Sequence, residues 1–215
     1  DARARFEAAW GTGIVPEYGW HLTQMFHGME RGELRTLYVI GENPADSEAD
    51  VAHTRKMLGD LDLLIVQDIF LTRTAELADV VFPASVAWAE SDGTVTSSER
   101  RVQRVRAAVP PPGEARHYID ILADVANAMG ANWGRPTAHD LWEELRHLSP
   151  LHRGMTWDRL DADGGLKWAC PSEDHPGSPF LHGWLWEPDL GGRGPAPFSV
   201  VHHAGPTAEL TEEFP

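Results

Sequence analysis

Residues 34–83 read LRTLYVIGENPADSEADVAHTRKMLGDLDLLIVQDIFLTRTAELADVVFP, and they carry the strongest indication of the fold class. It holds three short apolar runs, at Leu37–Ile40, Leu63–Val66 and Val80–Phe82. Each run is too short for a helix, contains β-branched residues and is bounded by turn or polar residues. Such runs are typical of strands that are buried on both faces of a parallel sheet. The stretch therefore predicts an α/β fold built on parallel strands.

A helix is expected between the first two strands. Residues 49–58 carry apolar side chains at a rough helical period, with Val51, Met57 and Leu58 among them. A strand, a helix and a second strand in this order form a β-α-β unit, whose crossover is expected to be right-handed.

Polar residues follow the first two strands directly. Gly41-Glu42-Asn43-Pro44 comes after the first strand, and residues 67–72, which read QDIFLT, come after the second. Both loops are expected at the carboxyl edge of the sheet, where open α/β sheets bind their ligands. A simple turn at Asn43-Pro44 and a cap at Gln67-Asp68 are the structural alternatives to a ligand site.

Further helices are expected where apolar side chains recur every three or four residues. They cover residues 2–10, 21–31, 117–129 and 137–148, with one short turn at 74–78. Thr137 and Asp140 have the spacing of a capping box at the start of the last helix. Residues 84–98 are predicted to be an irregular loop, residues 100–109 an exposed strand, and residues 151–215 an irregular connector rich in proline and glycine.

The composition argues against several classes of protein. A formal charge of −15 argues against a nucleic-acid partner, because non-specific binding to phosphate backbones depends on Lys and Arg. No apolar run is long enough for a membrane span, and no signal peptide is visible, although an upstream signal is compatible with a chain that begins without Met. The single cysteine, Cys170, cannot form an internal disulfide or hold an iron–sulfur cluster, and it indicates a reducing, cytoplasmic location.

Six phrases together resemble one known family. They are LYVIGENP at 37–44, IVQDIFLTRT at 65–74, ADVVFP at 78–83, WAESDGTVTSSERRVQRV at 88–105, PPGEAR at 111–116 and WACPSEDHP at 168–176. In order and spacing they are similar to the molybdopterin-guanine dinucleotide oxidoreductases of the DMSO reductase type, and within these to the catalytic alpha subunit of formate dehydrogenase.

The resemblance implies that the chain is an interior fragment of a larger enzyme. Residues 1–150 would be a Rossmann-like domain, with a mostly parallel sheet flanked by helices, that cradles a molybdopterin guanine dinucleotide carrying molybdenum or tungsten. Residues 151–215 would be the connector to a missing carboxy-terminal β-barrel domain. The iron–sulfur cluster, the metal ligand and the catalytic residues of such enzymes would lie in missing parts, so neither a catalytic residue nor a metal ligand is expected here.

The implied reaction oxidises formate to carbon dioxide and sends electrons to iron–sulfur clusters, and the fragment alone is expected to be inactive. The expected partners are the other domains of the parent chain, electron-transfer subunits and a small-molecule substrate. Two other functions stay open. One is a free-standing nucleotide-binding module without redox activity, and the other is a scaffold whose loops bind no ligand.

Cofactor contacts are expected in the loops. By the family pattern, Asn43, Gln67 and Asp68 contact one guanosine half, with further contacts near Ser91 and Tyr118. Side-chain amides and carboxylates also complement the donors and acceptors of guanine and the ribose hydroxyls. The full predicted set is Gly41, Glu42, Asn43, Pro44, Gln67, Asp68, Thr72, Ser91 and Tyr118.

The arginine cluster and the single cysteine each have a structural interpretation beside a functional one. The arginines between Arg100 and Arg106 either meet a pyrophosphate or another subunit, or they form a solvated face paired with Glu99. Cys170 has no second cysteine beside it, so a structural role is favoured over a metal or nucleophile role.

Overall fold

The computed structural model of this chain describes residues 2–181, 183, 193–195 and 197–205. Its helices are α1 Ala2–Trp10, α2 Leu22–Glu30, α3 Pro44–Ser47, α4 Val51–Gly59, α5 Arg73–Glu76, α6 Tyr118–Ala128, α7 Ala138–Leu148 and α8 Trp157–Ala162. Its strands are β1 Thr36–Ile40, β2 Leu63–Asp68, β3 Val80–Pro83, β4 Gly93–Thr96, β5 Arg101–Val105 and β6 Leu166–Lys167. Contacts divide the chain into two units, Asp1–Gly177 and Ser178–Pro215, and all of these elements belong to the first.

The first sheet consists of the three strands predicted from the sequence. Its order is β1-β2-β3, and both neighbouring pairs are parallel. The register places Leu37 opposite Leu64 and Ile65 opposite Val80. Because α4 lies between β1 and β2 in the chain, the predicted β-α-β unit is confirmed.

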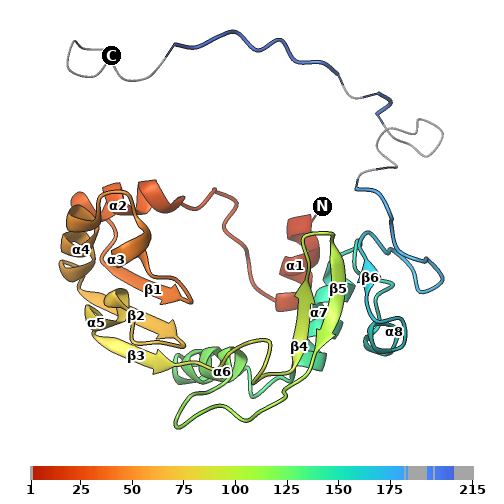
Figure 1. Cartoon of the computed structure of the whole chain (residues 1–215), viewed down its shortest axis with the longest axis horizontal. Coiled ribbons are helices and arrows are strands. Elements are labelled where there is room, and N and C mark those ends of the chain that lie inside the picture. The colour runs from red at the N-terminus through yellow and green to blue at the C-terminus, as the bar shows by residue number, and fades with distance from the viewer. Residues whose placement is uncertain (1, 182, 184–192, 196, 206–215) are drawn as a thin grey trace. The chain divides into compact units, whose positions relative to one another are not determined.

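Four helices, α2, α3, α4 and α5, pack on one face of this sheet (Figure 1). The core between strands and helices contains Phe26, Val39, Ala45, Met57, Leu58, Leu64, Val66 and Ala75. The side chain of Gln67, on the opposite face, contacts the start of α6 at Tyr118. The parallel sheet therefore lies between helices, as in an α/β fold.

The outer strands are more exposed than the sequence predicted. Ile40 of β1 is 40% exposed, and Val80 and Val81 of β3 are 36% and 37% exposed. Only β2, which pairs on both sides, is buried along most of its length. Burial on both faces was the wrong expectation for β1 and β3, because flanking helices cover the centre of so narrow a sheet better than its margins.

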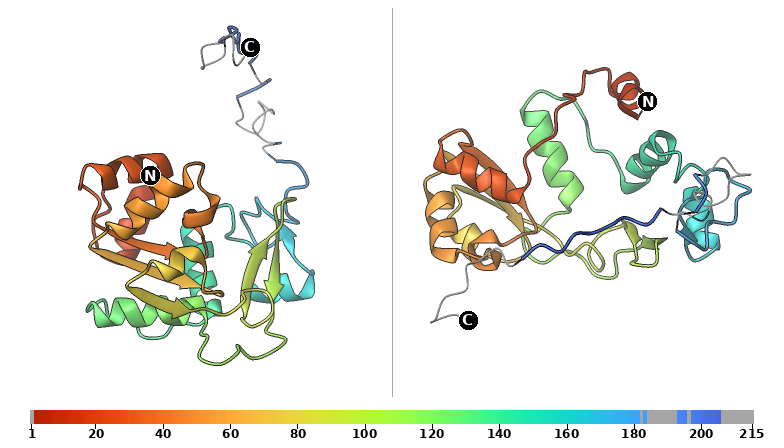
Figure 2. Two further views of the ribbon diagram at one scale, coloured as in Figure 1. Left: turned by 60° about the vertical axis from the view of Figure 1, so that its left-hand side comes forward. Right: turned by 90° about the horizontal axis from the view of Figure 1, so that it is seen from above.

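A second sheet is antiparallel, which the sequence did not predict. Its order is β4-β5-β6, and it is separate from the parallel sheet (Figure 2). Residues 93–96, expected in an irregular loop, form β4. The strand expected at residues 100–109 is the shorter β5, and its Val102 is only 1% exposed, so this strand is not fully exposed as predicted.

The stretch after residue 150 also differs from the expected irregular connector. Residues 157–162 form α8 and residues 166–167 form β6. With α7 and β5 they enclose a second core that contains Val102, Trp142, Met155, Leu160, Leu166 and Cys170. Within it, indole Nε1 of Trp142 donates a hydrogen bond to the carbonyl oxygen of Met155 at 2.7 Å. Residues 151–177 are therefore part of the first unit.

The remaining expectations for the chain concern helix bounds and the tail. The long helices begin and end within two residues of the predicted positions, and the capping box of Thr137 and Asp140 is confirmed. Among the described residues beyond Lys167, no further α-helix or strand occurs. Residues 184–192 and 206–215 of the predicted connector lie outside the described residues. No helix in the described part of the chain combines the length and the apolar character that crossing a membrane requires.

Candidate functional site

A cavity of about 290 Å³ lies at the carboxyl edge of the parallel sheet. Gly41 after β1, Asp68 at the end of β2 and Tyr118 at the start of α6 line it. The other lining residues are Ile69, Phe70, Ser85, Val86, Ala87 and Trp88. The structure therefore brings together three of the residues predicted for the site, and they come from three separate segments.

Two large aromatic side chains at this cavity are strongly exposed. Phe70 is 71% exposed and Trp88 is 73% exposed, although apolar residues of this size are usually buried. Sequence reasoning did not single them out for the site, because an aromatic residue in a loop carries no sign of its exposure. Aromatic faces beside polar groups suit the stacking of a planar ring.

Gly41 shapes the turn that leaves β1. Its φ of +65° is in the left-handed region, which glycine adopts without steric cost. Its N–H donates a hydrogen bond to the carbonyl oxygen of Gln67 at 2.9 Å, so the turn is fastened to β2. A Cβ at this position would lie 3.5 Å from the hydroxyl oxygen of Tyr118, which shows how closely this hydroxyl approaches the turn.

Asp68 and Tyr118 supply the polar groups of the cavity. Asp68 is only 9% exposed, and its Oδ1 accepts a hydrogen bond from the N–H of Phe70 at 3.1 Å. Burial and then the negative charge of Asp68 raise the pKa of the Tyr118 phenol above its usual value. The cavity therefore offers a carboxylate acceptor and a neutral hydroxyl near pH 7.

Asn43 has its side chain engaged between two loops. Its Oδ1 accepts hydrogen bonds from the N–H of Thr74 at 3.1 Å and from the Thr74 hydroxyl at 2.8 Å. Its Nδ2 donates to Asp46 at 2.9 Å. These bonds fasten the loop after β1 to the start of α5.

Gln67 is fully buried, although it was predicted to face the cofactor. Its Oε1 accepts a hydrogen bond from the Tyr38 hydroxyl at 2.5 Å. Its Nε2 donates to the carbonyl oxygen of Tyr118 at 3.5 Å. In this arrangement its amide contacts the protein interior and not the cavity.

The other predicted residues lie elsewhere around the edge. Glu42 and Pro44 line a separate, apolar cavity of about 410 Å³ beside α2. Thr72 caps α5, where its hydroxyl accepts a hydrogen bond from the N–H of Ala75 at 3.2 Å. The hydroxyl of Ser91 is buried against that of Ser85, 2.7 Å away, and Ser91 lines a third cavity of about 480 Å³.

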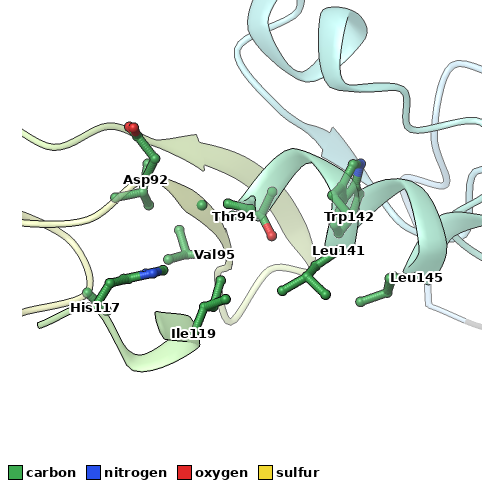
Figure 3. A pocket seen from close by; sticks show the side chains of 12 residues that line it. Asp92, Thr94, Val95, His117, Ile119, Leu141, Trp142 and Leu145 are labelled. Carbon is green, nitrogen blue, oxygen red and sulfur yellow. The ribbon is translucent and has the colours of Figure 1, made fainter. Parts of the chain in front are cut away.

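A fourth cavity, of about 230 Å³, lies between the β4–β5 hairpin, α7 and the start of α6. Figure 3 shows Asp92 and His117 at one end of it and Leu141 and Leu145 at the other. Burial lowers the pKa of His117, while the charges of Asp120 and Asp92 act in the opposite direction. No sequence pattern pointed to this cavity, since its walls come from elements far apart in the chain.

Three arginines of the cluster, Arg101, Arg104 and Arg106, pair with carboxylates of their own unit. Arg101 contacts Glu99 at 3.0 Å, and Arg104 contacts Asp161 at 3.1 Å. The guanidinium of Arg104 also stacks over Trp157, with its central carbon 3.4 Å from the ring centroid. Pairing with Glu99 is thus confirmed for Arg101, and Asp161 is the partner that the sequence did not indicate.

Comparison with known proteins identifies relatives of this chain. The sequence profile described as molybdopterin oxidoreductase matches residues 12–128. "F420-dependent formate dehydrogenase subunit alpha" of Methanocaldococcus jannaschii is 44% identical over 85% of this chain, which spans 27% of that protein. "Formate dehydrogenase H" of Escherichia coli is 33% identical over 99% of this chain, which spans 30% of that protein.

A solved structure supports the fold. Acetylene hydratase from Pelobacter acetylenicus superposes with a TM-score of 0.53 over 80% of this chain and 24% of that chain, at 20% sequence identity. At this identity the likeness concerns the fold alone. This chain spans less than a third of the length of each of these three proteins.

Proposed function

Because this chain belongs to the molybdopterin oxidoreductase family, we propose that it holds the guanosine part of a molybdopterin guanine dinucleotide within a formate dehydrogenase-like enzyme. In that enzyme formate is oxidised to carbon dioxide. The metal, molybdenum or tungsten, together with its pterins would supply the redox chemistry, and iron–sulfur clusters outside this chain would accept the electrons. The proposed cofactor domain contains residues 1–150 together with residues 151–177, which complete the second core of the same unit, and residues 178–215 are proposed to lead towards a further domain.

One observation carries the proposal. Gly41, Asp68 and Tyr118 come from three separate segments and line one cavity at the carboxyl edge of a parallel sheet. This edge is where open α/β sheets bind nucleotides.

The groups in the cavity fit a guanosine. The base presents two kinds of N–H donor side by side, and a carboxylate such as that of Asp68 accepts both. The Tyr118 hydroxyl can donate to or accept from a ribose hydroxyl. The exposed rings of Phe70 and Trp88 offer faces on which the base can stack.

The remaining predicted residues receive supporting roles. Asn43, Pro44 and Thr72 fix the two loops around the cavity through the contacts of α3 and α5. Glu42 and Ser91 lie at neighbouring cavities, where they are proposed to contact more distant parts of the dinucleotide. The proposed partners are the other domains of the parent chain and electron-transfer subunits, and the proposed location is the cytoplasm, which a single buried cysteine suits.

Titration with guanosine diphosphate tests the site. Removing the Asp68 charge by Asp68→Asn is expected to weaken binding at least about tenfold, because a hydrogen bond to a charged group contributes about 1.5–3 kcal/mol. Tyr118→Phe is expected to weaken it less. Asp62→Asn is the matched control, since it removes the same charge just before the amino end of β2. Equal affinities for Asp68→Asn and Asp62→Asn would contradict the proposal.

Metal and pterin analysis tests the enzyme. The protein made from the complete gene is expected to contain molybdenum or tungsten near stoichiometry together with a pterin. Guanosine binding without metal or pterin would instead indicate a nucleotide-binding module without redox activity. No binding at all would indicate a scaffold.

A further inference from the structure

We propose that Gln67 is a positioning residue of the guanosine cavity, which holds the cavity walls in place without touching the ligand. The inference rests on the proposed function for the identity of the ligand. It assigns to Gln67 a role different from the direct contact expected from its loop position.

Gln67 is connected to three of the four segments that line the cavity, the fourth being residues 85–88. Its carbonyl oxygen accepts the hydrogen bond of the Gly41 N–H at 2.9 Å, which fixes the turn after β1. Its side-chain Nε2 donates to the carbonyl oxygen of Tyr118 at 3.5 Å, which ties the start of α6 to β2. Asp68, the third wall, is its neighbour in the chain.

Tyr38 sets the orientation of the Gln67 amide. Its hydroxyl donates to Oε1 at 2.5 Å, so the amide nitrogen of Gln67 is left to face the Tyr118 carbonyl oxygen. The opposite orientation would place the amide oxygen against that carbonyl oxygen, and two acceptors would meet. Tyr38 lies on β1, the strand that leads into Gly41, so the polar chain links β1, β2 and α6.

Burial excludes a direct contact between Gln67 and a ligand in this arrangement. The residue has no exposed surface, whereas Asp68, the next residue, lines the cavity. Successive residues of a strand point to opposite faces, which explains why Gln67 is buried while Asp68 lines the cavity. A buried amide with both of its ends hydrogen-bonded also fixes one geometry, because an unpaired end costs about 1–3 kcal/mol.

The test compares Gln67→Met with the double variant Tyr38→Phe/Gln67→Met. Methionine has nearly the length of glutamine but cannot hold the Tyr118 carbonyl. In the single variant the Tyr38 hydroxyl loses its hydrogen-bond partner. The double variant removes that hydroxyl as well, so it leaves no unpaired hydroxyl that would destabilise the fold. Guanosine diphosphate affinity and the ionisation of each tyrosine are measured, the latter by NMR of ring-labelled tyrosine. Only three tyrosines occur in the chain, and Tyr→Phe variants assign their signals.

Both variants are expected to bind guanosine diphosphate about tenfold more weakly. In both, Tyr118 is expected to ionise at lower pH than in the wild type, because burial and the charge of Asp68 raise its pKa only while α6 is held at the cavity. The exposed Tyr18 supplies a reference signal in the same spectra.

Weaker binding with an unchanged Tyr118 titration would overturn the inference, since Gln67 would then act on the ligand itself. Unchanged affinity in the double variant would overturn it as well. If the wild type binds no guanosine diphosphate, the proposed ligand is wrong, and the Tyr118 titration still decides whether Gln67 positions α6.

Discussion

Asn43 illustrates, for a single residue, how a polar side chain at a ligand-binding edge can have a structural task. Its Oδ1 accepts both hydrogen bonds from Thr74, which is fully buried. Asn43→Ala leaves the N–H and hydroxyl of Thr74 without this acceptor, and we expect a loss of about 1–3 kcal/mol in unfolding free energy. Urea unfolding measures it. The neighbouring, exposed Glu42→Ala is the control and should change stability by less than about 0.5 kcal/mol. Equal stabilities of the two variants would refute a structural role for Asn43.

Two half-buried histidines, His117 and His152, are expected to make stability depend on pH. Burial lowers the pKa of His117 and of His152 below the usual value of 6.5. As the pH falls through that value, the unfolded chain takes up protons that the folded chain does not. Protonation therefore favours the unfolded state, and the free energy of unfolding falls. The unfolding free energy should therefore decrease between about pH 7.5 and pH 5.5, where few carboxylates titrate.

Substitution separates these histidines from the others. A His117→Gln/His152→Gln variant should lose less stability over the same pH range than the wild type. His203→Gln, which replaces an exposed histidine, should follow the wild type. Parallel curves for all three proteins would show that neither His117 nor His152 is responsible.

Neighbouring residues also show where sequence reasoning stops. Gln67 and Asp68 end one strand, so the alternation of side chains predicts that they point in opposite directions. The sequence does not say which of them faces the interior, because this depends on α6, whose first residue lies 51 positions later in the chain. Asp68 and Tyr118 could be selected from the sequence as candidates, but their meeting in one cavity could not.

The sequence predicts those elements that have a clear local pattern of apolar residues. The parallel strands are continuous apolar runs between turn or polar residues, and the long helices repeat apolar residues at a clear period; the structure contains both. β6 has two residues and α8 has six, which is too few for a period to emerge. β6 also depends on pairing with β5, more than sixty positions earlier in the chain. Such non-local pairing leaves no local signal.

Leu160 tests whether α8 belongs to a real core. It is 1% exposed and packs with Trp142, Met155 and Val102, so Leu160→Ala should remove about 2–5 kcal/mol of unfolding free energy. Leu151→Ala is the matched control, because Leu151 is 42% exposed. Urea unfolding of both variants measures the difference. A similar small loss for both variants would contradict a core role for α8 and would support the irregular connector that the sequence predicted for residues 157–162.

The first unit as a whole holds two hydrophobic cores. One core joins the parallel sheet to α2–α5, and the other joins the antiparallel sheet to α7 and α8. The two sheets share no strand, so each core is expected to protect mainly its own backbone hydrogen bonds. This organisation makes the position of the domain boundary testable.

Two shortened chains, residues 1–150 and residues 1–177, place that boundary. The shorter chain lacks β6, α8 and four buried residues of the second core, namely Met155, Leu160, Leu166 and Cys170. We expect hydrogen exchange of β4 and β5 to be much faster in residues 1–150 than in residues 1–177, because Val102 and Trp142 lose most of their packing partners. Exchange of β2 should stay slow in both chains, since its core lies wholly before residue 80. Equal protection of β5 in the two chains would place the boundary at residue 150, and loss of protection in β2 would show that the two cores unfold as one.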